Sequence, residues 1–215
     1  MFDIRRIKRN GSYGYQSRCL SDPKAALGHR PTRVEMYQAL GEGFKTYIKD
    51  GWLVCLANLG DLKSAELEWL DGPVEEFLLE LEKTLFQKSY KIPTILAFVT
   101  EQGIRDMIPL SEIGRSFQIF YTRESELREL DFQDKCNQGW EDWDNDDWAK
   151  LALHDPVEAL DGKGFFHYDS VGQVLRLDEL LGEFLNEKAL VEHVKDVMEY
   201  RRLRYLERRC VTVQG

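Results

Sequence analysis

The densest group of chemically distinctive side chains lies between residues 140 and 148, where three tryptophans are interspersed with five carboxylates. Tryptophan rings anchor protein interfaces, whereas crowded carboxylates repel one another unless a cation or a basic partner approaches them. The pattern predicts a surface that binds a basic protein and steers its association electrostatically. In the other interpretation, the tryptophans attach a loop to the core and the acids form its solvated face. We call these residues the acidic-aromatic segment: Trp140, Glu141, Asp142, Trp143, Asp144, Asp146, Asp147 and Trp148.

The same segment contains the spacing that opens a calcium-binding loop. Asp142, Asp144 and Asp146 alternate along the chain, and alternating carboxylates can converge on a hard cation. Asp147 and Leu153, however, stand where an EF-hand needs its glycine and its bidentate glutamate. The sequence therefore excludes an EF-hand but leaves looser binding of Mg²⁺ or Ca²⁺ open.

Other candidates for catalytic chemistry are two His-Asp pairs and one acid-acid-lysine set, whose spacing is also common by chance in so charged a chain. A catalytic zinc usually has three protein ligands, and a carboxylate and lysine after a strand need further acids to hold Mg²⁺. The chain has no phosphate-binding loop and no nucleophile-elbow motif. We therefore predict no catalytic residue, no metal site and no cofactor. The two pairs are His167 with Asp169 and His193 with Asp196, and the acid-acid-lysine candidate is Asp61 and Lys63 with Asp50 before the strand predicted over residues 52–59.

Charge is distributed unevenly along the chain. The net charge is -9, yet residues 1–33 carry +6, residues 34–200 carry -19 and residues 201–215 carry +4. The basic ends could contact phosphates, whereas the carboxyl-terminal arginines could instead dock on the acid-rich residues 124–161 of the same chain. The candidate basic patch consists of Arg5, Arg6, Arg9, Tyr13, Tyr15, Arg201, Arg204 and Arg208.

Length and composition indicate an ordinary globular protein. The chain has 215 residues, of which 43% are hydrophobic, and no apolar run approaches the ~18 residues of a membrane span. Four cysteines occur singly, which favours reduced thiols over a disulfide framework, and no secretory signal is recognisable. We expect one soluble, cytoplasmic domain over residues 1–215 that does not bind membranes.

The pattern of elements predicts an α+β fold with a central mixed sheet packed by amphipathic helices. Asn10-Gly11 favours an amino-terminal hairpin over residues 2–19, and a capping box at residues 32–35 begins a helix that runs to about residue 48. Apolar runs predict strands, and stripes at helical spacing predict further helices. The predicted strands are 52–59, 94–100, 104–108, 116–122, 164–168 and 174–177. The further predicted helices are 73–85, 146–153, 178–185 and a long terminal helix over 187–209, with 131–147 as a loop or insertion.

Three function hypotheses follow. The first is a non-enzymatic interaction protein, of the inhibitor, immunity or antitoxin kind, that engages a basic protein through the acidic-aromatic segment. The second is a metal-dependent hydrolase that acts on nucleic acid or nucleotides and contacts phosphates through the basic ends. The third is a nucleic-acid-binding accessory subunit that uses the amino-terminal hairpin, with its tyrosines stacking on bases.

Overall fold

The computed structural model describes the backbone of residues 29–213 and the side chains of residues 29–209. The predicted amino-terminal hairpin lies outside these residues. The chain divides into two compact units, with the boundary after Glu82. The α+β class is confirmed, because many helices accompany one three-stranded sheet in the described part of the chain.

The first unit is helical over the residues that the structure describes. The predicted capping box is present, since Thr32 accepts a hydrogen bond from the Glu35 amide and Glu35 accepts one from the Thr32 amide. The predicted helix is shorter than expected, because it ends at Gly41 and resumes after a single 3₁₀ turn. The helices are α2 (Arg33–Leu40), α3 (Phe44–Tyr47), α4 (Trp52–Leu59), α5 (Ser64–Leu67) and α6 (Pro73–Lys83).

The strand predicted over residues 52–59 is wrong, because these residues form helix α4. A short apolar run buried on all sides has the same appearance in sequence whether it is a strand or a helix. Trp52 begins the helix after Gly51, which adopts a φ of 102°, and the Trp52 amide donates to Glu82 at 3.1 Å. Glu82 also accepts two hydrogen bonds from the buried Arg33, at 2.9 and 2.7 Å. The buried ion pair thus fixes the start of α4.

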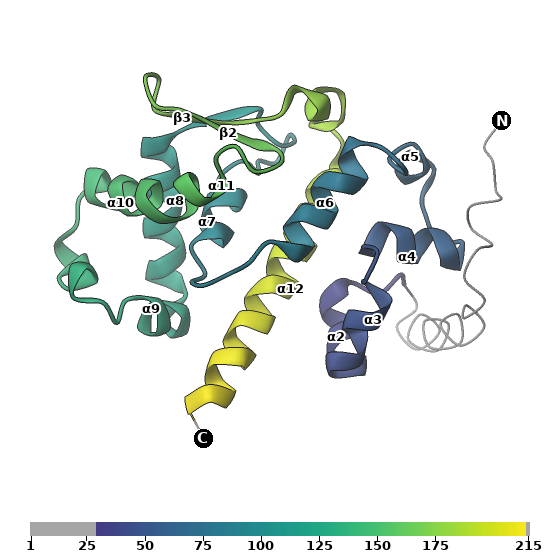
Figure 1. Ribbon diagram of the computed structural model, residues 1–215, viewed down its shortest axis with the longest axis horizontal. Helices are drawn as coiled ribbons and strands as arrows, with labels where there is room; N and C mark the ends of the chain where they lie inside the picture. Colours follow the sequence, from purple (N-terminus) through teal and green to yellow (C-terminus); the bar gives the residue numbers. More distant parts are fainter. Residues whose placement is uncertain (1–28, 214–215) are drawn as a thin grey trace. The chain divides into compact units, whose positions relative to one another are not determined.

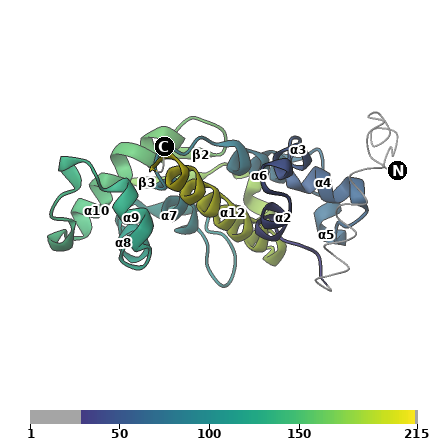
Figure 2. The same ribbon diagram turned by 90° about the horizontal axis from the view of Figure 1, so that it is seen from below.

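The second unit combines helices with the sheet. Figure 1 shows α8 and α10 side by side, and Figure 2 shows α12 beside α7. Its helices are α7 (Lys91–Leu96), α8 (Leu110–Arg123), α9 (Ser125–Asp131), α10 (Asn145–Ala152), α11 (Glu158–Leu160) and α12 (Lys188–Val213). A π-helical turn, Leu153–Val157, contains Pro156 and joins α10 to α11.

The sheet of the second unit is antiparallel, in the order β1-β3-β2, rather than mixed. Its strands are β1 (Met107–Pro109), β2 (Phe166–Asp169) and β3 (Val174–Leu177), so the predicted hairpin at residues 164–177 is confirmed. Leu175 pairs with Ile108 on one side and with Tyr168 on the other. The strand predicted near residue 104 begins only at residue 107. The predicted helix at residues 178–185 is a 3₁₀ helix, Glu179–Phe184.

Two further strands predicted in this unit are wrong. Residues 94–100 begin inside α7, and residues 116–122 lie inside α8. The buried residues of α8 recur at the three- and four-residue spacing of a helix only when the turn before residue 116 is included. They are Leu110, Ile113, Gly114, Phe117 and Tyr121.

Helices α8 and α10 approach closely at Gly114. A Cβ atom at this position would lie 2.7 Å from the Ala149 amide nitrogen and 3.0 Å from the Asn145 carbonyl oxygen. The Asn145 side chain also donates a hydrogen bond of 3.0 Å to the Ser111 carbonyl. These contacts fix α10, which contains Asp146, Asp147 and Trp148 of the acidic-aromatic segment, against the buried face of α8.

Candidate functional site

The three tryptophans of the acidic-aromatic segment belong to a cluster of rings centred on Phe132. The ring centroids of Trp140, Trp143 and Trp148 lie 6.4, 5.9 and 5.9 Å from that of Phe132. Tyr121 of α8 stacks on Trp148 with an angle of 12° between the rings. We call these five residues the aromatic cluster. It connects the segment to the core of the second unit.

Exposure differs among the three tryptophans. Trp148 lies in α10 and is 1% exposed, whereas Trp140 and Trp143 are half-buried. The Arg128 guanidinium lies 4.4 Å from the Trp140 ring centroid and donates to the Tyr121 carbonyl at 2.7 Å. Trp148 therefore packs against the other two rings from the core side. Of the three tryptophans, only Trp140 and Trp143 have exposed surface that a partner could contact.

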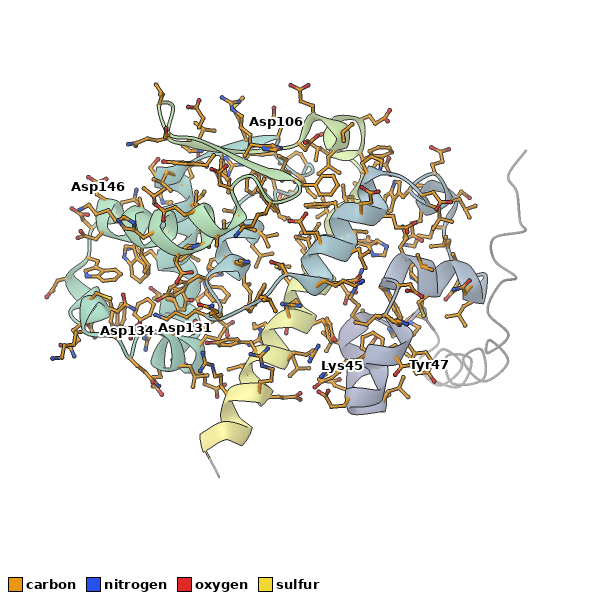
Figure 3. The ribbon with its side chains drawn as sticks, in the orientation of Figure 1. Lys45, Tyr47, Asp106, Asp131, Asp134 and Asp146 are labelled. Carbon is orange, nitrogen blue, oxygen red and sulfur yellow. The ribbon has the colours of Figure 1, made fainter. Side chains whose placement is uncertain are left out.

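The carboxylates of the segment lie on its outer side. Asp144 caps α10 by accepting hydrogen bonds from the amides of Asp146 and Asp147, at 2.9 and 3.0 Å. Asp147 pairs with Lys150 at 3.1 Å, and this hydrogen bond raises the pKa of Lys150. Glu141, Asp142, Asp144 and Asp146 are exposed, and Figure 3 shows Asp146 beside α10 at the edge of its unit.

The metal candidates do not come together in the part of the chain that the structure describes. No group of three or more His, Cys, Asp or Glu side chains there could hold a metal ion. His167 lies 3.1 Å from Asp178, whereas Asp169 accepts hydrogen bonds from the Val171 and Gly172 amides. The backbone carbonyl of Asp61 accepts a hydrogen bond from Arg30.

A buried carboxylate network, which the sequence did not predict, lies beneath the aromatic cluster. Asp131 is 1% exposed and ends α9. Its Oδ2 atom accepts hydrogen bonds from the Ser89 amide at 3.0 Å, from the Tyr121 hydroxyl at 2.9 Å and from the Ser89 hydroxyl. Its Oδ1 atom accepts one from the Tyr205 hydroxyl of α12. We call Ser89, Tyr121, Asp131 and Tyr205 the Asp131 network; Figure 3 labels Asp131 next to α9.

A second layer of polar groups surrounds this network. The Tyr90 hydroxyl accepts a hydrogen bond from Asn137 at 3.0 Å and donates to the Asp131 carbonyl at 3.4 Å. Lys88 donates to Tyr90 at 3.3 Å and to Asp134 at 2.6 Å, and the latter bond lowers the pKa of Asp134. Burial raises the pKa of Tyr90 to about 12. These groups, which include the buried Asn137, cover the network on the side of the exposed Asp134.

The chemistry of the Asp131 network is structural. A serine hydroxyl bonded to a carboxylate has the arrangement of a nucleophile and its base, but a nucleophile must reach its substrate. Ser89 and Tyr121 are both completely buried. Burial raises the pKa of Tyr121 well above its usual value and, with the hydrogen bond to Asp131, that of Tyr205. The hydroxyls therefore stay protonated and serve as donors that hold α8, α9 and α12 together.

Two contacts join helix α12 to the acid-rich residues 124–161, and neither comes from the arginines Arg201, Arg204 and Arg208 that were predicted to dock there. The contacts come from Tyr205, through Asp131, and from Arg202, which lies 3.0 Å from Glu124. The helix itself was predicted at residues 187–209 and is confirmed as α12.

The arginines predicted for the basic patch on α12 have mixed surroundings. Arg201 donates to the Thr84 carbonyl and lies 4.3 Å from the Phe86 ring centroid. Arg204 donates to the Tyr200 hydroxyl at 3.2 Å, and Arg208 is exposed. Arg201 and Arg204 are half-buried and take part in packing within the second unit. The amino-terminal members of the patch lie outside the described residues.

Comparisons with known proteins add no relative. The chain matches no protein-family model, no curated protein and no solved structure. Among the residues that the structure describes, none of the helices has the length and apolar character needed to cross a membrane.

Proposed function

We propose that this protein is a non-enzymatic interaction protein, of the inhibitor, immunity or antitoxin kind, that binds a basic protein through the acidic-aromatic segment. One observation carries the proposal. Trp140 and Trp143 are half-buried on a rigid aromatic cluster, and exposed carboxylates surround them on the same short stretch of chain.

Rigidity favours this role. Binding loses less conformational entropy when the contacting side chains are already ordered, and tryptophans are frequent hot spots of interfaces. Trp143 lies 5.1 Å from Trp148 in an edge-to-face contact, and Arg128 holds the opposite ring, Trp140. Both rings are therefore prepared to receive a partner without rearrangement.

The charge of the segment indicates the chemistry of that partner. Asp147 forms an ion pair with Lys150, but Glu141, Asp142, Asp144 and Asp146 form none with any residue in the described ranges. Like charges at this density repel one another, and lysine or arginine side chains of a partner relieve the repulsion. A basic protein, rather than an acidic or purely apolar one, fits this surface.

The test compares two variants of equal net charge. In the segment variant, Asp142, Asp144, Asp146 and Asp147 are replaced by Asn; Asn retains the capping ability of Asp144. In the control variant, four exposed acids elsewhere in the second unit are neutralised: Glu101→Gln, Asp106→Asn, Glu179→Gln and Glu183→Gln. Each purified protein is immobilised and incubated with extract of the source cells, and captured basic proteins are then purified and titrated against all three forms.

The wild-type and control proteins are expected to capture the same basic partner, and the segment variant is expected to lose it. The affinity of the purified partner should fall with rising salt, because exposed charges are screened. The proposal is wrong if the segment variant retains every captured protein, or if the wild type captures no basic protein.

A further inference from the structure

A groove of about 510 Å³ lies between helices α7, α8 and α12 of the second unit. Its volume is within the range of about 300–1,000 Å³ that is usual for binding pockets. Its apolar lining comes from all three helices: Ile92 and Leu96 of α7, Ile119 and Phe120 of α8, and Met198 of α12. The groove shares no residue with the acidic-aromatic segment.

The walls of the groove are tied together by hydrogen bonds. The Ser116 hydroxyl of α8 donates to the Pro93 carbonyl of α7 at 2.8 Å. Arg202 of α12 bonds Glu124, just beyond α8, at 3.0 Å and Glu199 of its own helix at 2.8 Å. These bonds join α8 to both neighbours, so the groove is preformed.

One wall of the groove exposes a large apolar side chain. Ile119 is 47% exposed, although the opposite face of α8 is buried, with Phe117 and Tyr121 at 0% exposure. An apolar side chain exposed next to an apolar hollow, with charged residues around it, is typical of an interaction site. Ile119 is thus the natural centre of a contact.

The uncompensated charge on the rim is positive, in a protein of net charge -9. The rim carboxylates Glu124 and Glu199 are engaged by Arg202. Arg123 and Lys195 are exposed on opposite walls, and neither forms an ion pair with another residue of the described chain. Charge complementarity therefore favours an occupant that is apolar in the centre and acidic at its edges.

We propose that this groove binds an amphipathic, acidic helix of a partner protein. A helix presents apolar residues at positions i, i+3 or i+4, and i+7 as one stripe, which is the standard way of filling a groove between helices. That stripe covers Leu96, Ile119 and Phe120, and flanking acids reach Arg123 and Lys195. A peptide fits better than an acyl chain because the charged walls offer partners to side chains. This partner is opposite in charge to the one proposed for the acidic-aromatic segment, so the two proposals stand independently.

The test selects ligands without knowledge of the partner. A display library of helical peptides, roughly 15–20 residues long so that each can form a helix, is panned against the full-length protein. Selected peptides are then titrated against Ile119→Asp, against the pair Arg123→Ala with Lys195→Ala, and against Leu180→Asp. Leu180 is 65% exposed and lies outside the groove, so it provides a matched apolar-to-acid control.

The selected peptides should carry an apolar stripe with acidic flanks. We expect Ile119→Asp to weaken their binding by about tenfold or more, as for a central hot spot. The paired cation variant should weaken it and reduce its dependence on salt, and Leu180→Asp should leave it unchanged.

Four outcomes would overturn the proposal. The first two are a library that yields no binder and a library that yields only binders that Ile119→Asp leaves intact. The third is self-association of the wild type in sedimentation velocity that Ile119→Asp abolishes, which assigns the groove to a second copy. The fourth is dodecanoate that binds in calorimetry and displaces the peptides, which assigns the groove to an acyl chain.

Discussion

Asp131 and Asp146 belong to the same acid-rich stretch of sequence, but their surroundings are opposite. Asp131 is 1% exposed and accepts hydrogen bonds from a tyrosine hydroxyl of α8, from one of α12 and from Ser89. Asp146, in contrast, is exposed at the start of α10. The first carboxylate joins elements of the second unit, and the second faces solvent. Local charge density therefore does not indicate what an acidic residue does; the donors that the fold brings to it decide its role.

The energetics of the two environments differ for a simple reason. A buried carboxylate loses its hydration, which costs several kcal/mol unless hydrogen bonds replace the water. The Asp131 network supplies these bonds through Ser89, Tyr121 and Tyr205. The exposed carboxylates keep their water and contribute little to the stability of the fold. Substitutions can test this difference, beginning with the buried Asp131 and ending with the exposed carboxylates.

Asp131→Ala is expected to have the largest effect, a loss of about 3 kcal/mol or more in the free energy of unfolding. The substitution removes the charged acceptor that the buried hydroxyls of Ser89, Tyr121 and Tyr205 share, and a hydrogen bond to a charged group contributes about 1.5–3 kcal/mol. Urea denaturation followed by tryptophan fluorescence measures the change. Asp134→Asn is the control, because Asp134 is exposed and should alter stability only slightly. Equal losses in the two variants would contradict the comparison.

Tyr205→Phe tests a single bond of the Asp131 network. A hydrogen bond to a charged group contributes about 1.5–3 kcal/mol, so we expect a loss of about 2 kcal/mol. Hydrogen exchange should also become faster in the last turns of α12, because Tyr205 connects that part of the helix to Asp131. Tyr168→Phe is the control, since the Tyr168 hydroxyl, on a half-buried side chain, has no hydrogen bond to a described residue. Unchanged exchange in Tyr205→Phe would show that other contacts of α12, such as the Arg202–Glu124 ion pair, hold this part of the helix.

The sequence indicates the exposed acidic-aromatic segment, whereas it does not indicate the buried Asp131 network. Helices with caps and amphipathic stripes, such as α2, α6 and α12, were predictable because local signals define them. The tryptophan and carboxylate pattern marked the candidate surface because its residues are contiguous. The packing of these tryptophans on Phe132 is a tertiary contact that the sequence does not reveal.

The Asp131 network could not be predicted for a similar reason. Ser89, Asp131 and Tyr205 are far apart in sequence, and no local pattern links a hydroxyl to a distant acid. The strands predicted at 52–59 and 116–122 failed because strongly apolar or β-branched and aromatic runs were interpreted over too short a window. The three- and four-residue spacing of α8 is recognisable only when the window also includes the preceding turn, which contains Gly114.

At alkaline pH, the free energy of unfolding should fall by roughly 1 kcal/mol per pH unit for each tyrosine whose pKa is raised in the folded state. Burial raises the pKa of Tyr90 to about 12, against a value of about 10 in the unfolded chain. The native state therefore keeps a proton that the unfolded state loses, so stability is complete below about pH 10 and falls as the pH rises toward 12. Denaturation between these values should show a shallower slope for Tyr90→Phe than for the wild type. Identical slopes would mean that Tyr90 titrates alike in both states.

Asp144→Ala should have a smaller effect, about 1 kcal/mol, because it removes the cap of α10. Asp144→Asn should cost almost nothing, since the Asn side chain also accepts hydrogen bonds from the amides of the first turn. The same denaturation assay distinguishes the two. Asp142→Ala is the control, because Asp142 is exposed and lies outside α10. If Asp144→Asn were as harmful as Asp144→Ala, the charge of Asp144 rather than its cap would stabilise α10.

The smallest effect is expected for Asp142→Asn with Asp146→Asn, within about 0.5 kcal/mol of the wild type. Two terms oppose each other here. Asp146 lies in the first turn of α10, where a negative charge is favourable by about 0.3–1 kcal/mol, but neutralisation also relieves its repulsion by Asp144 and Asp147. Because both terms are screened, denaturation at low and high salt should give nearly the same small difference. A loss above 1 kcal/mol would make these carboxylates part of the fold, and their exposure would then no longer favour a binding role.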